Sequence, residues 1–289
     1  MRLFRRGVLA GLAGLALSRA ARAAGPLRIV AAENMYGDIA AQISGGLARV
    51  TSILKNPNED PHMFSASPSV ARELAAADVV IVNGADYDPW MAPLLAASAA
   101  PGRVVINVAA LLGRKPGDNP HLWYDPAAAP ALIARLVAVL AAKDAANASV
   151  YQRNGAGLLA ALAPVYARVA ALRAKYAGTP VSATEPVFGL MARALGLVMR
   201  NQDFQRAVMN GTEPAPSDVG AFEDDLRLRR VRVLFYNAQV TDDLTASLLA
   251  LARRSGVPVV GVSETEPAGV NYQAWLASGL DAADKALGG

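Results

Sequence analysis

Residues 158–176 read LLAALAPVYARVAALRAKY, and their apolar side chains recur at alternating intervals of four and three residues. The recurring positions are Leu158, Leu162, Val165, Val169, Leu172 and Tyr176. This spacing places all six on one face of a helix. If the helix extends over 146–177, it is about 48 Å long at 1.5 Å per residue, which is enough to run along two domains. Pro164 lies in its interior and predicts a kink, because proline removes a backbone hydrogen bond.

Short runs rich in Val and Ile alternate with helical patterns on both sides of this segment. The predicted strands are at 27–31, 50–54, 79–82 and 104–108 before it, and at 181–183, 197–199, 231–236 and 259–262 after it. Strands that alternate with helices are typical of parallel sheets. We therefore predict an α/β fold of two lobes, each a mostly parallel sheet flanked by helices, joined by one long helix. The predicted segments are a signal peptide at 1–23, an N-terminal metal-binding lobe at 24–145, a linking helix at 146–178 and a C-terminal metal-binding lobe at 179–289.

The first 23 residues have the pattern of a secretory signal. A basic start with Arg5 and Arg6 precedes a short apolar stretch from Gly7 to Ser18, and a small-residue pattern ends at Ala23. The apolar stretch is too short to span a bilayer, which takes roughly 20 residues. We expect cleavage near Ala23, by either the Sec or the twin-arginine route, and a periplasmic protein without a stable membrane anchor.

Charge and cysteine content narrow the class further. The formal charge of the 289 residues is +4, and removing the five arginines of the signal leaves −1, so the basic character belongs to the signal. Nucleic-acid binding therefore loses its electrostatic basis. The chain has no cysteine, which excludes disulfides and an anchor through a lipidated cysteine.

The chain has two histidines, and each follows a proline. His62 lies in Asp60-Pro61-His62, after the predicted strand at 50–54, and His121 follows Asn119-Pro120, after the strand at 104–108. Either one alone could equally cap a turn. Because the carboxyl ends of parallel strands lie at one edge of a sheet, the pair could share one metal ion.

Two carboxylates occupy corresponding places in the second half of the chain. Glu185 follows the predicted strand at 181–183, and Glu264 follows the strand at 259–262. A carboxylate there could simply favour a helix N-terminus. Together with two neutral imidazoles, however, two carboxylates form a nearly closed site that suits Zn²⁺ or Mn²⁺.

The chain resembles the periplasmic zinc- and manganese-binding proteins of ABC importers, over nearly the whole mature length. The resemblance is carried by the segments at 31–38 (AAENMYGD), 60–62 (DPH), 77–84 (ADVVIVNG), 119–126 (NPHLWYDP), 184–190 (TEPVFGL), 264–267 (ETEP) and 272–275 (YQAW). It implies two α/β lobes joined by a long helix, with His62, His121 and Glu185 as metal ligands. The family usually has Asp where this chain has Glu264, so Glu266 is a competing candidate for the fourth ligand.

Two departures from the family bear on the metal. Glu185 stands where the zinc-specific branch commonly has a third histidine, and an oxygen-rich set tolerates Mn²⁺ better, although zinc usually binds the same ligands more tightly. The short segment 112–118 replaces a His- and Asp-rich loop. The transported ligand is therefore predicted to be Zn²⁺ or Mn²⁺, without a choice between them.

The predicted function is a solute-binding protein, not an enzyme, that delivers a divalent metal ion to an ABC permease and acts as a monomer. The alternative is a periplasmic metalloenzyme of the hydrolase kind, with an open water position on the metal. No HExxH helix or nucleophile elbow accompanies the candidate ligands, which favours the receptor.

Overall fold

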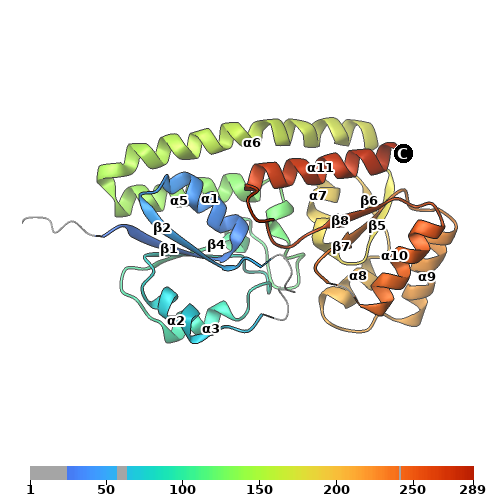
Figure 1. Ribbon diagram of the computed structural model, residues 1–289, viewed down its shortest axis with the longest axis horizontal. Coiled ribbons are helices and arrows are strands. Elements are labelled where there is room, and N and C mark those ends of the chain that lie inside the picture. Colours follow the sequence, from blue (N-terminus) through green and yellow to red (C-terminus); the bar gives the residue numbers. More distant parts are fainter. Residues whose placement is uncertain (1–24, 57–63, 241) are drawn as a thin grey trace, which may run out of the picture.

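The computed structural model describes residues 25–56, 64–240 and 242–289. The predicted signal peptide and His62 lie outside these residues. Within them the chain forms two lobes side by side, with one long helix running along both (Figure 1). The predicted two-lobed α/β fold is confirmed.

The first lobe is a parallel four-stranded sheet in the order β2-β1-β3-β4. Its strands are β1 (Leu27–Glu33), β2 (Ala48–Leu54), β3 (Val79–Val82) and β4 (Val104–Asn107). Its helices are α1 (Asn34–Ser44), α2 (Pro68–Ala75), α3 (Met91–Ala97), α4 (Val108–Leu111) and α5 (Ala128–Lys143), with a 3-10 turn η2 (Leu122–Tyr124) before α5. Helices α1 and α5 cover one face of the sheet, and α2 and α3 cover the other (Figure 1).

The second lobe repeats this plan with the strand order β6-β5-β7-β8, again all parallel. Its strands are β5 (Pro180–Ala183), β6 (Val198–Met199), β7 (Leu234–Asn237) and β8 (Val259–Val262). Its helices are α7 (Gly189–Ala194), α8 (Gln202–Met209), α9 (Pro216–Arg227), α10 (Asp243–Arg254) and α11 (Tyr272–Gly288), and a 3-10 turn η4 (Pro186–Phe188) precedes α7.

Two details of the second lobe differ from the predictions. Strand β7 begins at Leu234, three residues later than predicted, although the N–H of Arg232 already donates to the carbonyl of Pro180 in β5. Helix α8 was not predicted; its eight residues bury Phe204 and Gln205 and give too short a pattern to separate from a loop.

Helix α6 (Ala148–Tyr176) joins the lobes, preceded by a 3-10 turn η3 (Ala145–Asn147). It continues through Pro164 and buries the six predicted apolar positions. The segment Ala145–Tyr176 has the length and apolar composition of a membrane-spanning helix. Helix α6 packs against α1, α5 and α11, and the rest of its surface is exposed.

The largest hydrophobic core continues from one lobe into the other. Alternate strand residues face it, such as Ile29 and Ile81 in the first sheet and Phe235 in the second, while Val30 and Val80 face a smaller core under α2 and α3. Helix α11 lies beside α6 and contributes Leu280 and Leu287 to the same core (Figure 1). The lobes are therefore joined by shared packing, and the ends of their strands are held in a fixed relation.

Candidate metal centre

His121 is the first-lobe residue of a buried cluster between the lobes. It precedes η2 and is fully buried. The Oδ1 atom of Asn119 accepts a hydrogen bond from the backbone N–H of His121 and lies 2.8 Å from its Nδ1 atom. Because the Nδ2 atom of Asn119 donates to the carbonyl of Pro186, Oδ1 is the side that faces the imidazole. The proton is therefore assigned to Nδ1, and Nε2 keeps the lone pair that a metal ion needs.

Glu185 and Glu264 are the second-lobe residues of the cluster. Glu185 follows β5 and Glu264 follows β8, and their side chains are 2% and 0% exposed. Strand β7 lies between β5 and β8, and its last residue is the buried Asn237. The Nδ2 atom of Asn237 donates to Glu185 Oε2 at 2.7 Å and to Glu264 Oε1 at 2.5 Å. One amide therefore orients both carboxylates.

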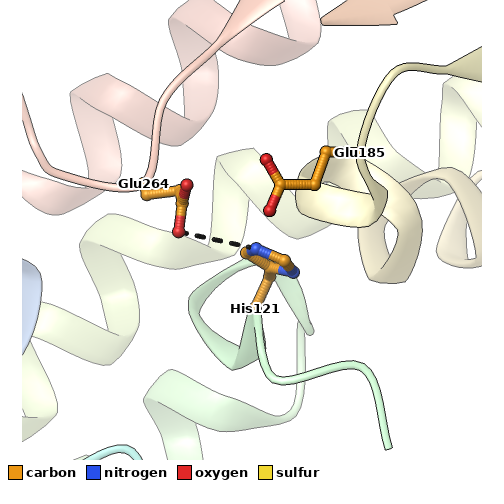
Figure 2. Close-up of side chains that lie close together, drawn as sticks. All are labelled: His121, Glu185 and Glu264. Carbon is orange, nitrogen blue, oxygen red and sulfur yellow. Dashed lines mark ion pairs between the residues drawn. The ribbon is translucent and has the colours of Figure 1, made fainter. Parts of the chain in front are cut away.

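The three side chains converge on one point from three loops (Figure 2). One ligand atom from each of His121, Glu185 and Glu264 lies within 4.8 Å of the other two. The Nε2 atom of His121 has no hydrogen-bond partner among the described residues and lies 3.6 Å from Glu264 Oε2. Two negative charges held within 4.8 Å of each other would repel by about 3 kcal/mol or more at an effective dielectric constant of 20. A dication placed between them would reverse that cost.

Glu266, the competing candidate for the fourth ligand, is not part of this cluster. Its backbone N–H donates to Asn34 Oδ1 at 2.9 Å, and its carbonyl accepts from Asn34 Nδ2 at 2.7 Å. Burial, and then the charge of Asp38, raise the pKa of the Glu266 carboxyl to about 8. In this structure Glu266 joins the second lobe to α1, while Glu264 faces His121.

Aromatic rings form the first-lobe wall of the cluster. The ring of Trp123 meets the imidazole of His121 edge-on, with centroids 5.4 Å apart, and the ring of Tyr87 lies 6.0 Å from the imidazole. Burial, and then the negative charge of Glu264, raise the pKa of the Tyr87 hydroxyl well above its usual value. Tyr87 therefore keeps its proton and offers a neutral donor beside the carboxylates.

Sequence reasoning missed the residues that orient the ligands. Asn119 lies in the quoted Asn-Pro-His step and Asn237 directly follows the predicted strand at 231–236, so both stand where ligand-supporting side chains are expected in α/β sheets. Without the tertiary structure, an asparagine at a strand end reads equally well as a turn residue. The pairing of Asn237 with two carboxylates from neighbouring strands is a product of strand order.

Comparison with known proteins places this chain in a family. Residues 29–286 match the family described as zinc-uptake complex component A, periplasmic (ZnuA). The iron-binding protein YfeA of Yersinia pestis is 25% identical over 244 residues, which cover 81% of this chain and 76% of YfeA. A putative metal-binding protein of Thermotoga maritima is 32% identical over 103 residues, about a third of either chain.

Solved structures share the fold. The solute-binding protein FpvC of Pseudomonas aeruginosa, in complex with Mn²⁺, superposes with a TM-score of 0.74 at 22% identity, over 91% of this chain and 98% of FpvC. A structural likeness at that sequence identity shows the two-lobed fold and does not identify metal ligands in this chain.

Proposed function

The chain belongs to the ZnuA family of periplasmic metal-uptake components, and on this premise we propose that it captures a divalent transition metal ion between its lobes and delivers it to the permease of an ABC importer. One observation carries the proposal. A histidine from the first lobe and two carboxylates from the second, all at most 2% exposed, bring their ligand atoms within 4.8 Å of one another. Buried carboxylates are costly unless a cation or hydrogen-bond donors compensate them. Here one amide, that of Asn237, donates to both, and a divalent ion between them would supply the opposite charge.

The proposed ligands are His62, His121, Glu185 and Glu264. The last three form the observed cluster. His62 lies outside the described residues, and its assignment rests on the sequence. In the sequence His62 follows β2, whose carboxyl end lies at the same sheet edge as the loop of His121. Glu264 is preferred to Glu266 because only Glu264 joins the cluster.

The proposed ion is Zn²⁺ or Mn²⁺. Two imidazoles and two carboxylates neutralise a dication and suit either metal, and the oxygen share favours Mn²⁺ more than an all-histidine site would. The relatives named above include an iron-binding protein, and the fold also occurs in a Mn²⁺ complex. Competition between the two ions would show whether ligand chemistry or metal supply sets the occupant.

The proposal includes a periplasmic location, a signal peptide cleaved near Ala23 and a monomeric protein without a stable membrane anchor. A metalloenzyme of the hydrolase kind is the alternative. It needs a water molecule on the metal that exchanges with solvent. The family is one of solute-binding proteins, and the three clustered ligand residues are buried, which favours a closed coordination sphere.

The test is a metal titration of the mature chain after removal of bound metal with a chelator. We expect one Zn²⁺ or Mn²⁺ per chain, loss of binding in His121→Ala and Glu264→Gln, and nearly unchanged affinity in the matched control Glu266→Gln. Stoichiometric binding in a His62→Ala/His121→Ala double variant would overturn the site. Water-proton relaxation of the Mn²⁺ complex separates the alternatives, since rapid water exchange at the ion would favour an enzyme.

A further inference from the structure

A cavity of about 600 Å³ in the second lobe reaches one of the proposed ligands. It lies between the end of α8 with the loop that follows and the start of α10. Glu185, which is 2% exposed, forms part of its wall. Other parts of the wall, such as Glu213 and Asp243, belong to exposed residues. The cavity therefore extends from exposed residues to one member of the buried cluster, Glu185.

The cavity wall is acidic. Its wall includes the acidic residues Glu185, Glu213, Asp242 and Asp243, and no Lys, Arg or His is among the described residues that line it. Asp242 caps α10 by accepting a hydrogen bond from the N–H of Thr245, and Asp243 lies in the first turn, so the helix N-terminus explains these two. Glu213 lies in the loop between α8 and α9 and has no such structural reason. A low-dielectric cavity with charges of one sign concentrates ions of the opposite sign.

A second cavity gives the contrast. It has a volume of about 370 Å³ and also borders the lobe junction, at Asn119 and Pro186. Arg193 and Arg206 belong to its wall, and no Asp or Glu is among the described residues that line it. Both cavities share Met209. Of these two cavities, electrostatics therefore favours the acidic one for a cation. A third cavity, beside Tyr87, also has acidic residues in its wall, Asp86 and Asp118, but its volume is only about 80 Å³.

The size of the acidic cavity also fits a hydrated ion. A water molecule takes up about 30 Å³, so an ion with six waters needs on the order of 200 Å³. A cavity of about 600 Å³ can hold such an ion while its waters are exchanged for protein oxygens.

We propose that this acidic cavity is the route by which the divalent ion reaches and leaves the site between the lobes, and that Glu185 is the ligand it meets first. The inference rests on the proposed function. Glu213 and Asp243 then act on the rate of capture and are not ligands of the final complex. The described ligands are buried, so a defined route would determine how fast the ion exchanges.

The test measures association and release rates of Mn²⁺ on the full mature chain by stopped flow, with a fluorescent chelator that reports free Mn²⁺. An obstructing side chain, Leu244→Trp, should slow association and release by the same factor, at least fivefold, and leave Kd within twofold. Slower association and release with an unchanged Kd indicates an obstructed route, because a change in a ligand would alter Kd. Thr212→Trp obstructs the same cavity and serves if the first variant folds poorly.

Charge variants provide an independent arm. Glu213→Gln/Asp243→Asn should slow association threefold to tenfold at low salt and weaken its salt dependence. Leu228→Trp and Asp203→Asn are matched controls, since both residues are exposed, lie in the same lobe and line neither cavity. Native association and release rates in both Leu244→Trp and Thr212→Trp, with native Kd, would overturn the proposed route but not the proposed function. No Mn²⁺ or Zn²⁺ binding at equilibrium by the native chain would overturn the proposed function itself.

Discussion

Asn237→Ala should weaken metal binding without removing a ligand. The Nδ2 group of Asn237 donates to Glu185 and Glu264 at 2.7 and 2.5 Å, and its side chain is 2% exposed. A hydrogen bond to a charged group contributes about 1.5–3 kcal/mol, so both together contribute at most about 6 kcal/mol. Much of this cancels in the affinity, because the metal-free site loses the same donor.

The remaining loss of affinity arises because the two carboxylates are no longer held in the orientation that the ion needs. Residues that hold metal ligands in place typically change affinity by about 10- to 100-fold, which is about 1.4–2.7 kcal/mol. We expect this increase in Kd, together with a metal-free protein less stable by about 2 kcal/mol, since the two carboxylates then repel each other with no donor between them. Chelator competition measures the first quantity, and urea unfolding of the metal-free protein measures the second.

Asn154→Ala is the matched control. Asn154 lies on α6 and donates to the carbonyl of Ile43, so its loss affects stability away from the cluster. Its Kd should stay within twofold of the native value. A folded Asn237→Ala protein with native affinity would refute the argument that this amide holds the carboxylates for the ion.

Three further predictions follow from single features. Mn²⁺ binding should change the tryptophan emission, because Trp123 meets His121 edge-on, and Trp123→Phe should remove most of that change while Kd rises less than threefold; an unchanged signal in that variant would contradict the assignment. Pro164→Ala should raise the stability of the chain by about 1–3 kcal/mol with native Kd, because Pro164 is an exposed residue inside α6, and a lower melting temperature would disagree. Burial, and then Asp88, raise the pKa of the Glu33 carboxyl well above its usual value, so the folded state keeps this proton longer than the unfolded state. The metal-free protein should therefore lose stability as pH rises above 4.5, by up to about 1.4 kcal/mol per pH unit for this group, and Glu33→Gln should make its free energy of unfolding depend less on pH. If urea unfolding from pH 5 to 8 gives the same pH dependence of that free energy for both proteins, the effect is excluded.

The two lobes are joined by one shared hydrophobic core. The largest hydrophobic cluster runs through both lobes and is lined by α6 and α11. Hydrogen bonds also cross between the lobes, from the Tyr124 hydroxyl to the carbonyl of Ser263 and from Asn119 to Pro186. Both hydrogen bonds lie within a few residues of the cluster of His121, Glu185 and Glu264. Changes in the ligand residues should therefore act on affinity more than on the relative position of the lobes.

Much of the fold could be predicted from the sequence by itself. Apolar runs of strand length, separated by helical patterns, determine parallel sheets, and the spacing from Leu158 to Tyr176 determines a long helix with one buried face. The same rules place His121, Glu185 and Glu264 after strands, at sheet edges where side chains can meet.

Only the tertiary structure decided which of those side chains meet. Glu264 and Glu266 are two residues apart in one loop, and no local pattern separates them. The choice depends on α1, since Asn34 holds the backbone of Glu266 and leaves Glu264 facing His121. The position of Asn237 between the two carboxylates likewise depends on strand order, because β7 lies between the strands that precede them. Local patterns describe periodicity along the chain, whereas these contacts depend on how two separate sheets pack against each other.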